Sequence, residues 1–139
     1  MAIRNRIPLI KVAVGCLVNN NQEILIARRG KNKLLPDLWE FPGGKLEQNE
    51  SYKDALYREL KEEINISIKV DLIESLLVKT ISYGDFDCKV EFFLCNEWEG
   101  EILALEQQQL IWQKIDDLER VAMLQGNDEV IYLLQQRVF

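Results

Sequence analysis

The 139-residue sequence contains no histidine, which excludes His-based catalytic triads, histidine general bases and the usual zinc sites. Glutamate, lysine and tyrosine remain as the side chains that could transfer a proton. Cysteine is scarce: Cys16, Cys88 and Cys95 have no CxxC spacing and lie in apolar, strand-like stretches. We therefore interpret them as core thiols of a protein in a reducing cytoplasm.

The sequence also lacks an excess of positive charge, since its formal net charge is −6. Without a basic stripe, a nucleic-acid polymer is not an expected partner. No apolar segment approaches transmembrane length, and the short apolar run 12–18 ends at an asparagine triplet typical of a turn. We therefore expect no membrane partner either.

What is present is the size and composition of one globular domain spanning residues 1–139, with 47% apolar and 29% charged residues. Runs of β-branched and aromatic residues predict a hairpin and further strands, at 11–18 with 23–28, 66–80, 87–98 and 110–112. A turn is predicted at 83–85, a short helix from 116 and a closing helix over 128–137. Strands interleaved with helices predict an α/β sandwich with a mixed sheet.

The segment after residue 51 has the clearest helix signals of the sequence. Ser51, with Asp54 three residues later, forms a capping-box-like start. Apolar residues then recur every four positions, as on the buried side of a helix, at Tyr52, Leu56, Leu60 and Ile64. Asn65 follows, and asparagine tolerates the left-handed cap conformation, so we predict a helix from Tyr52 to Ile64.

Three carboxylates, Glu59, Glu62 and Glu63, project from one face of this predicted helix. Carboxylates this close repel one another unless a cation lies between them. Oxygen ligands suit a hard divalent cation, Mg²⁺ or Mn²⁺, which also binds substrate phosphates. Upstream, Gly43 and Gly44 offer backbone without side chains, where a metal or a phosphate could approach.

These residues resemble the Nudix box. Gly44, five residues, Glu50, seven residues and the run 58–66, RELKEEINI, match the family's pattern at all but one position. The departure is Asn65, where the family usually has glycine, and we expect little functional cost because asparagine can adopt the same backbone. The resemblance implies a Nudix-type α/β/α sandwich with a mixed β-sheet.

Beyond the box, the sequence is most similar to the MutT-type branch of the family. Five features carry this similarity: the hairpin with paired arginines at 20–29, the approach 38–45, the turn 98–101, Glu106 before Trp112, and Asn127 before a helix. The branch implies Mg²⁺-dependent hydrolysis of the oxidised nucleotide 8-oxo-dGTP to the monophosphate and pyrophosphate, with Mn²⁺ as a substitute. We expect a monomer rather than a dimer.

The resemblance implies a role for each site residue. The metal ligands would be the Gly43 carbonyl, Glu59, Glu62, Glu63 and Glu106. Glu59 is the first candidate for the general base and Glu106 the second. Arg58, through Glu50, would orient the helix carboxylates. The substrate contacts would come from Arg29, Phe41, Lys45 and Asn127.

Outside the box, these residues also have structural interpretations. Arg29 could be a surface arginine on a hairpin, and Glu106 a solvated loop residue. Asn127 could be an ordinary N-cap of the helix that follows it. The three tryptophans are expected to pack in the core or at turns rather than to stack on a base.

The box alone does not select a substrate. Within the family, the alternative is a pyrimidine nucleotide such as CTP, or a pterin triphosphate. From a different class, the alternative is a non-catalytic Nudix-like recognition module, although such modules typically lack acidic ligands that are all present here. Thermal stabilisation by Mg²⁺ would separate the enzyme from a purely structural protein.

Overall fold

In the computed structural model, which describes residues 7–33 and 35–137, strand β1 (Leu9–Leu17) lies inside a four-stranded sheet. Its neighbours are the edge strand β4 (Gly43–Lys45) and β7 (Asp87–Cys95), and β6 (Glu74–Ser82) pairs with β7 at the other edge. β1 and β7 run parallel, whereas the other two pairings are antiparallel. The sheet is therefore mixed, as predicted.

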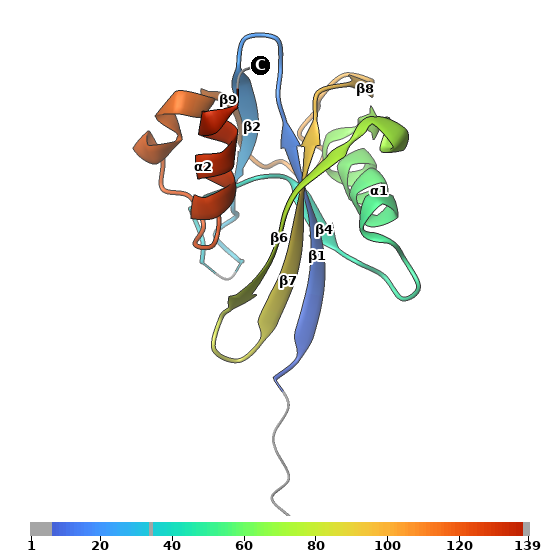
Figure 1. The fold of residues 1–139 in the computed structure, drawn as a ribbon, viewed down its shortest axis with the longest axis vertical. Coiled ribbons are helices and arrows are strands. Elements are labelled where there is room, and N and C mark those ends of the chain that lie inside the picture. The colour runs from blue at the N-terminus through green and yellow to red at the C-terminus, as the bar shows by residue number, and fades with distance from the viewer. Residues whose placement is uncertain (1–6, 34, 138–139) are drawn as a thin grey trace, which may run out of the picture.

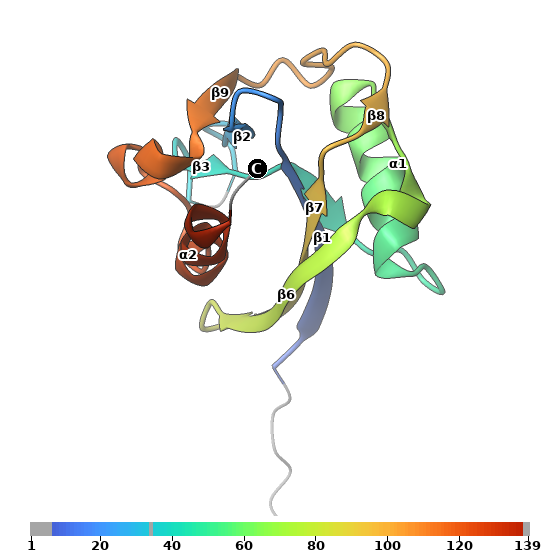
Figure 2. The same ribbon diagram turned by 45° about the horizontal axis from the view of Figure 1, so that its top comes forward.

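Helix α1 (Tyr52–Ile64) covers one face of this sheet and α2 (Asp128–Gln136) covers the other (Figures 1 and 2). Because side chains alternate along a strand, β1 directs Ala13 and Leu17 into the core beneath α1 and Cys16 into the core beneath α2. The expected α/β sandwich is confirmed. Among the described residues, no helix is long and apolar enough to cross a membrane.

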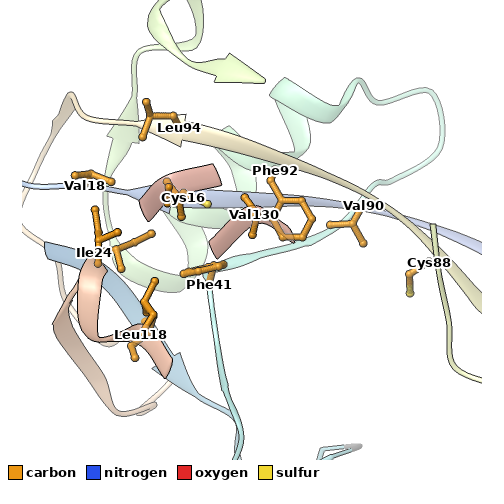
Figure 3. Close-up of a cluster of buried hydrophobic side chains, with 13 residues drawn as sticks. Cys16, Val18, Ile24, Phe41, Cys88, Val90, Phe92, Leu94, Leu118 and Val130 are labelled. Carbon is orange, nitrogen blue, oxygen red and sulfur yellow. The ribbon is translucent and has the colours of Figure 1, made fainter. Parts of the chain in front are cut away.

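The core beneath α2 takes every second residue of β7 (Figure 3). Leu94, Phe92 and Val90 follow one another along the strand, and Cys88 lies at the end of the row. Phe41 and Val130 pack in the same cluster, and Phe41 is only 4% exposed. Phe41 therefore serves the core as well as any site near it.

A second sheet has the order β3-β2-β9, formed by Trp39–Glu40, Glu23–Arg28 and Leu110–Lys114. β5 (Ser67–Ile68) and β8 (Trp98–Glu99) form a separate two-stranded pair. Two 3₁₀ helices complete the described elements, η1 (Val70–Leu72) and η2 (Ile115–Arg120). The short helix expected from residue 116 is η2.

The predicted pairing of 11–18 with 23–28 is wrong. Both strands exist and the asparagine turn joins them, but only Val18 and Ile24 form a bridge between them. β1 pairs instead with β4 and β7, and β2 pairs with β3 and β9. The partners lie far away in the sequence, so local turn chemistry could not indicate them.

Two predicted strands are also interrupted. The segment 66–80 contains η1 between β5 and β6, and the segment 87–98 ends at Cys95 before β8 begins at Trp98. By contrast, α1 has the predicted bounds. The Ser51 hydroxyl accepts a hydrogen bond from the Asp54 N–H at 3.1 Å, and Asn65 adopts the left-handed conformation with φ 68° and ψ 22°.

Candidate active site

A pocket of about 820 Å³ opens between the α2-side face of the central sheet, the loop after β2 and the Glu59 face of α1. It has the volume of a small-molecule site. The pocket brings together eight of the residues proposed from the sequence: Arg29, Phe41, Gly43, Lys45, Glu59, Glu63, Glu106 and Asn127. Glu50, Arg58 and Glu62 lie outside its lining.

The glycine pair lets α1 carboxylates approach the edge of the sheet. A Cβ on Gly43 would overlap the Ala13 carbonyl oxygen, because β4 pairs closely with β1 at this point. A Cβ on Gly44 would overlap the Glu59 carboxylate, lying 2.7 Å from its Oε1. The missing side chain at Gly44 is therefore the space that the Glu59 carboxylate occupies.

Arg58 fixes the position of Glu59 from outside the pocket. Its Nε and Nη2 donate to the two carboxylate oxygens of Glu50, each at 2.9 Å. Nη1 donates to Glu59 Oε1 at 2.8 Å, and Nη2 also donates to the Lys45 carbonyl at 2.9 Å. One guanidinium thus ties α1 to β4 and to the loop between them, which is the geometry that a positioning residue needs.

Glu63 is a partly buried carboxyl of the pocket. Burial and the neighbouring charges of Glu59 and Glu106 raise the pKa of Glu63 to about 8, although the Gly43 N–H and Lys33 act in the opposite direction. The Gly43 N–H donates to Glu63 Oε2 at 3.3 Å. A carboxylate cluster with this little positive compensation is suited to hold a cation.

The loop that carries Glu106 is tied to the C-terminal end of α1. The Leu105 N–H and the Gln108 side-chain amide both donate to the Glu63 carbonyl, at 3.0 Å and 3.3 Å. The Leu103 N–H donates to the Ile64 carbonyl at 3.0 Å. These contacts hold the loop against α1, so that Glu106 lines the pocket although its side chain is exposed.

The donor set fits a hard divalent cation in its chemistry. Glu59, Glu63 and Glu106 present carboxylates to one pocket beside the Gly43 backbone. Among the residues that the structure describes, no three potential ligands already converge on a single point. Glu62 is the outlying member, since its side chain is 59% exposed and lies 3.6 Å from Arg58. A rotation of Glu62 would be needed for it to join the others.

The other end of the pocket contains Arg29 and Asn127. Arg29 Nη1 donates to Glu40 Oε2 at 2.7 Å, and the pair is about four-fifths buried. Asn127 is 7% exposed and lies at the N-cap position of α2, but its side chain does not cap the helix. Its amide nitrogen donates instead to the Leu124 carbonyl at 2.8 Å.

Sequence analysis missed an aromatic wall of the pocket. Tyr83 and Phe86 stack with ring centroids 5.2 Å apart, and both line the pocket together with Cys88. The sequence identified 83–85 only as a turn. A stacked pair at the tip of the β6–β7 hairpin could be found only by knowing that this hairpin folds over the pocket.

The ion pair between Glu50 and Arg58 gives a pH prediction. The Arg58 hydrogen bonds, with a further one from the Glu47 N–H, lower the pKa of Glu50 from 4.5 to about 2. The pair therefore stabilises the folded state fully above about pH 5 and less as the pH falls toward about 2. The free energy of unfolding of the wild type minus that of Glu50→Gln should follow this profile in urea titrations. A difference that does not change with pH would contradict this assignment.

The fold and the site together define a class of protein: an α/β domain whose acidic helix contributes carboxylates to an open pocket. Residues 9–134 match the family model described as the NUDIX domain. The chain belongs to the Nudix family and is a Nudix hydrolase. Hydrolases of this family generally use a divalent metal.

Individual relatives match between 71% and 92% of the chain. The chain is 34% identical over 128 residues to an 8-oxo-dGTP diphosphatase of Buchnera aphidicola, covering 92% of this chain and 95% of the relative. It is 31% identical over 99 residues to a CTP pyrophosphohydrolase of Escherichia coli, covering 71% and 72%. A solved MutT structure, from work on the Aliivibrio salmonicida and Vibrio cholerae proteins, has a TM-score of 0.77 at 31% identity and covers 91% and 96%.

Proposed function

We propose that this Nudix hydrolase is an Mg²⁺-dependent 8-oxo-dGTP diphosphatase that releases the monophosphate and pyrophosphate, and so prevents replication errors. The observation that carries the proposal is the position of Asn127, buried in the same pocket as Glu59 and Glu63. The sequence similarity to 8-oxo-dGTP diphosphatases supports the same substrate.

Asn127 has a chemical reason to select the oxidised base. Unmodified guanine presents N7 as a hydrogen-bond acceptor. Oxidation at C8 places a hydrogen on N7, and this N7–H can donate a hydrogen bond to an amide oxygen. No described residue donates to Asn127 Oδ1, while its amide nitrogen is held by Leu124. The oxygen is therefore oriented and available for the base.

The acidic residues supply the reaction end of the pocket. The Gly43 carbonyl, Glu59, Glu62, Glu63 and Glu106 would hold the metal. When bound, Mg²⁺ offsets the charge of the triphosphate and lowers the pKa of a water.

Glu59 is the proposed acceptor of the proton from the attacking water, and Glu106 is the second candidate, because the acids of one cluster titrate together. Arg58, which is hydrogen-bonded to Glu50, would keep Glu59 oriented through the hydrogen bond from its Nη1 to Glu59 Oε1. Lys45 would bind a phosphate, while Arg29 and Phe41 would contact the nucleoside. By resemblance to the MutT branch, the attack falls on the β-phosphorus.

We propose that residues 1–139 act as one domain, as a monomer in the cytoplasm. The three cysteines are buried and unpaired, which agrees with a reducing compartment.

The CTP pyrophosphohydrolase relative favours a second candidate within the family, the hydrolysis of a pyrimidine nucleotide. The choice between the two substrates depends on the residues at the end of the pocket that contains Arg29 and Asn127. A non-catalytic recognition module is disfavoured, because Glu59, Glu62 and Glu63 are all present on α1.

Asn127→Ala tests the proposed base recognition. We expect kcat/KM for 8-oxo-dGTP to fall about tenfold or more, the effect of losing one well-placed hydrogen bond, while turnover of dGTP changes little. Steady-state kinetics with both nucleotides measure the difference. An equal loss on both substrates would assign Asn127 to the packing of the loop before α2 and would favour the pyrimidine alternative.

A further inference from the structure

A loop between β2 and β3 carries a lysine that the proposed mechanism does not use. Residues 29–38 are closed at their base by the Arg29 N–H, which donates to the Leu38 carbonyl at 2.8 Å. The Lys33 N–H donates to the Gly30 carbonyl at 3.2 Å, forming a turn around residues 31 and 32. This turn holds the backbone of Lys33, which is one of the residues that line the pocket.

Lys33 lies at the carboxylate end of the pocket. It lines the pocket with Glu63 and Glu106, and its positive charge acts on Glu63. Arg29, at the other end, is engaged with Glu40 at 2.7 Å. Lys33 has no carboxylate within salt-bridge distance among the residues that the structure describes. Because Lys33 lines the pocket beside Glu63 and Glu106, its ammonium could contact phosphates bound at this end.

We propose that Lys33 binds the β- and γ-phosphates of the substrate, and hence the pyrophosphate product, and so selects triphosphates. The inference rests on the proposed function. A metal held by the α1 carboxylates would offset part of the phosphate charge, and Lys33, which lines the same end of the pocket, would add a second positive charge from the β2–β3 loop. Three donors on a long flexible stem suit this role, since the phosphate oxygens change position during the reaction.

Inhibition by pyrophosphate separates the proposed role of Lys33 from the roles of Arg29 and Asn127 at the other end of the pocket. Attack on the β-phosphorus joins the water oxygen to that atom and breaks its bond to the oxygen that bridges to the α-phosphate. The monophosphate leaves with the bridging oxygen, and the β- and γ-phosphates leave together as pyrophosphate. A residue that binds these two phosphates therefore affects inhibition by pyrophosphate but not by the monophosphate.

The test compares Lys33→Ala with Lys31→Ala, a lysine of the same loop that does not line the pocket. In Lys33→Ala, we expect the Michaelis constant for the triphosphate substrate and the inhibition constant for inorganic pyrophosphate each to rise about tenfold, the cost of one charged hydrogen bond. The inhibition constant for the monophosphate product should change by less than about twofold, as should all three constants in Lys31→Ala, since exposed charges interact weakly. Lys33→Arg should restore pyrophosphate inhibition.

Equal inhibition constants for pyrophosphate in Lys33→Ala and Lys31→Ala would overturn the proposal. A parallel rise for pyrophosphate and the monophosphate would also overturn it, because it would indicate a distorted loop. Calorimetric titration of pyrophosphate into Mg²⁺-loaded wild type and Lys33→Ala needs no nucleotide turnover. If the wild type fails to hydrolyse 8-oxo-dGTP, the titration still tests Lys33, and only the proposed function fails.

Discussion

Glu59→Gln is expected to lower turnover at least about 100-fold while the protein remains folded, because general-base catalysis contributes at least that much. Glutamine has nearly the shape of glutamate and fits the space beside Gly44, so that packing is preserved. It lacks the charge that binds a cation, and it cannot take a proton from water at neutral pH. Glu62→Gln is expected to show a loss of the same size if its side chain rotates to join the metal site.

Circular dichroism and steady-state kinetics with Mg²⁺ provide the measurements for these two variants. Glu97→Gln is a matched control, since Glu97 is 55% exposed, does not line the pocket and is paired only weakly with Lys69 at 3.9 Å. It should retain full activity. Near-normal turnover in both Glu59→Gln and Glu62→Gln would rule out this site.

Gly44→Ala is expected to reduce turnover by about 10- to 100-fold with a small change in stability, since a displaced catalytic group is costly even when the displacement is small. The added methyl group would overlap the Glu59 carboxylate, which is the end of a flexible side chain and can move away. The movement breaks the hydrogen bond to Arg58 at 2.8 Å and takes Glu59 out of position.

Gly43→Ala separates this effect from damage to the fold. Its methyl group would overlap the Ala13 carbonyl on β1, which is backbone and cannot move without breaking the pairing of β4. We expect this variant to lose at least about 2 kcal/mol of stability, in the range of strongly destabilising substitutions. Gly30→Ala, where a Cβ meets nothing within 4 Å, controls for stability. Thermal unfolding and kinetics on all three variants test the contrast, and a fully active Gly44→Ala would contradict the proposed position of Glu59.

Local signals in the sequence were sufficient for α1. The Ser51 cap, the apolar stripe and Asn65 lie within fifteen residues of one another, and the structure has the helix at the predicted residues. The strand pairing was not accessible in the same way. β1 takes its partners from residues 43–45 and 87–95, and no turn between 18 and 23 contains information about them.

The site residues also differ in whether local sequence could predict them. The residues of the box lie on one helix and the loop before it, so the sequence could group them. Tyr83, Phe86 and Lys33 come from loops whose own sequences indicate only turns. They meet the carboxylates because the β6–β7 hairpin and the β2–β3 loop fold over the same pocket. Asn127 was open to two interpretations, and the side chain is found bonded to Leu124 rather than capping α2.

The most direct test of the proposed function is a parallel turnover assay with Mg²⁺, comparing 8-oxo-dGTP with the four ordinary deoxynucleoside triphosphates and CTP, with identification of the phosphate product. A strong preference for 8-oxo-dGTP, with release of pyrophosphate, is the predicted result. Equal or better turnover of a pyrimidine nucleotide, or no turnover of any of these compounds, would contradict it.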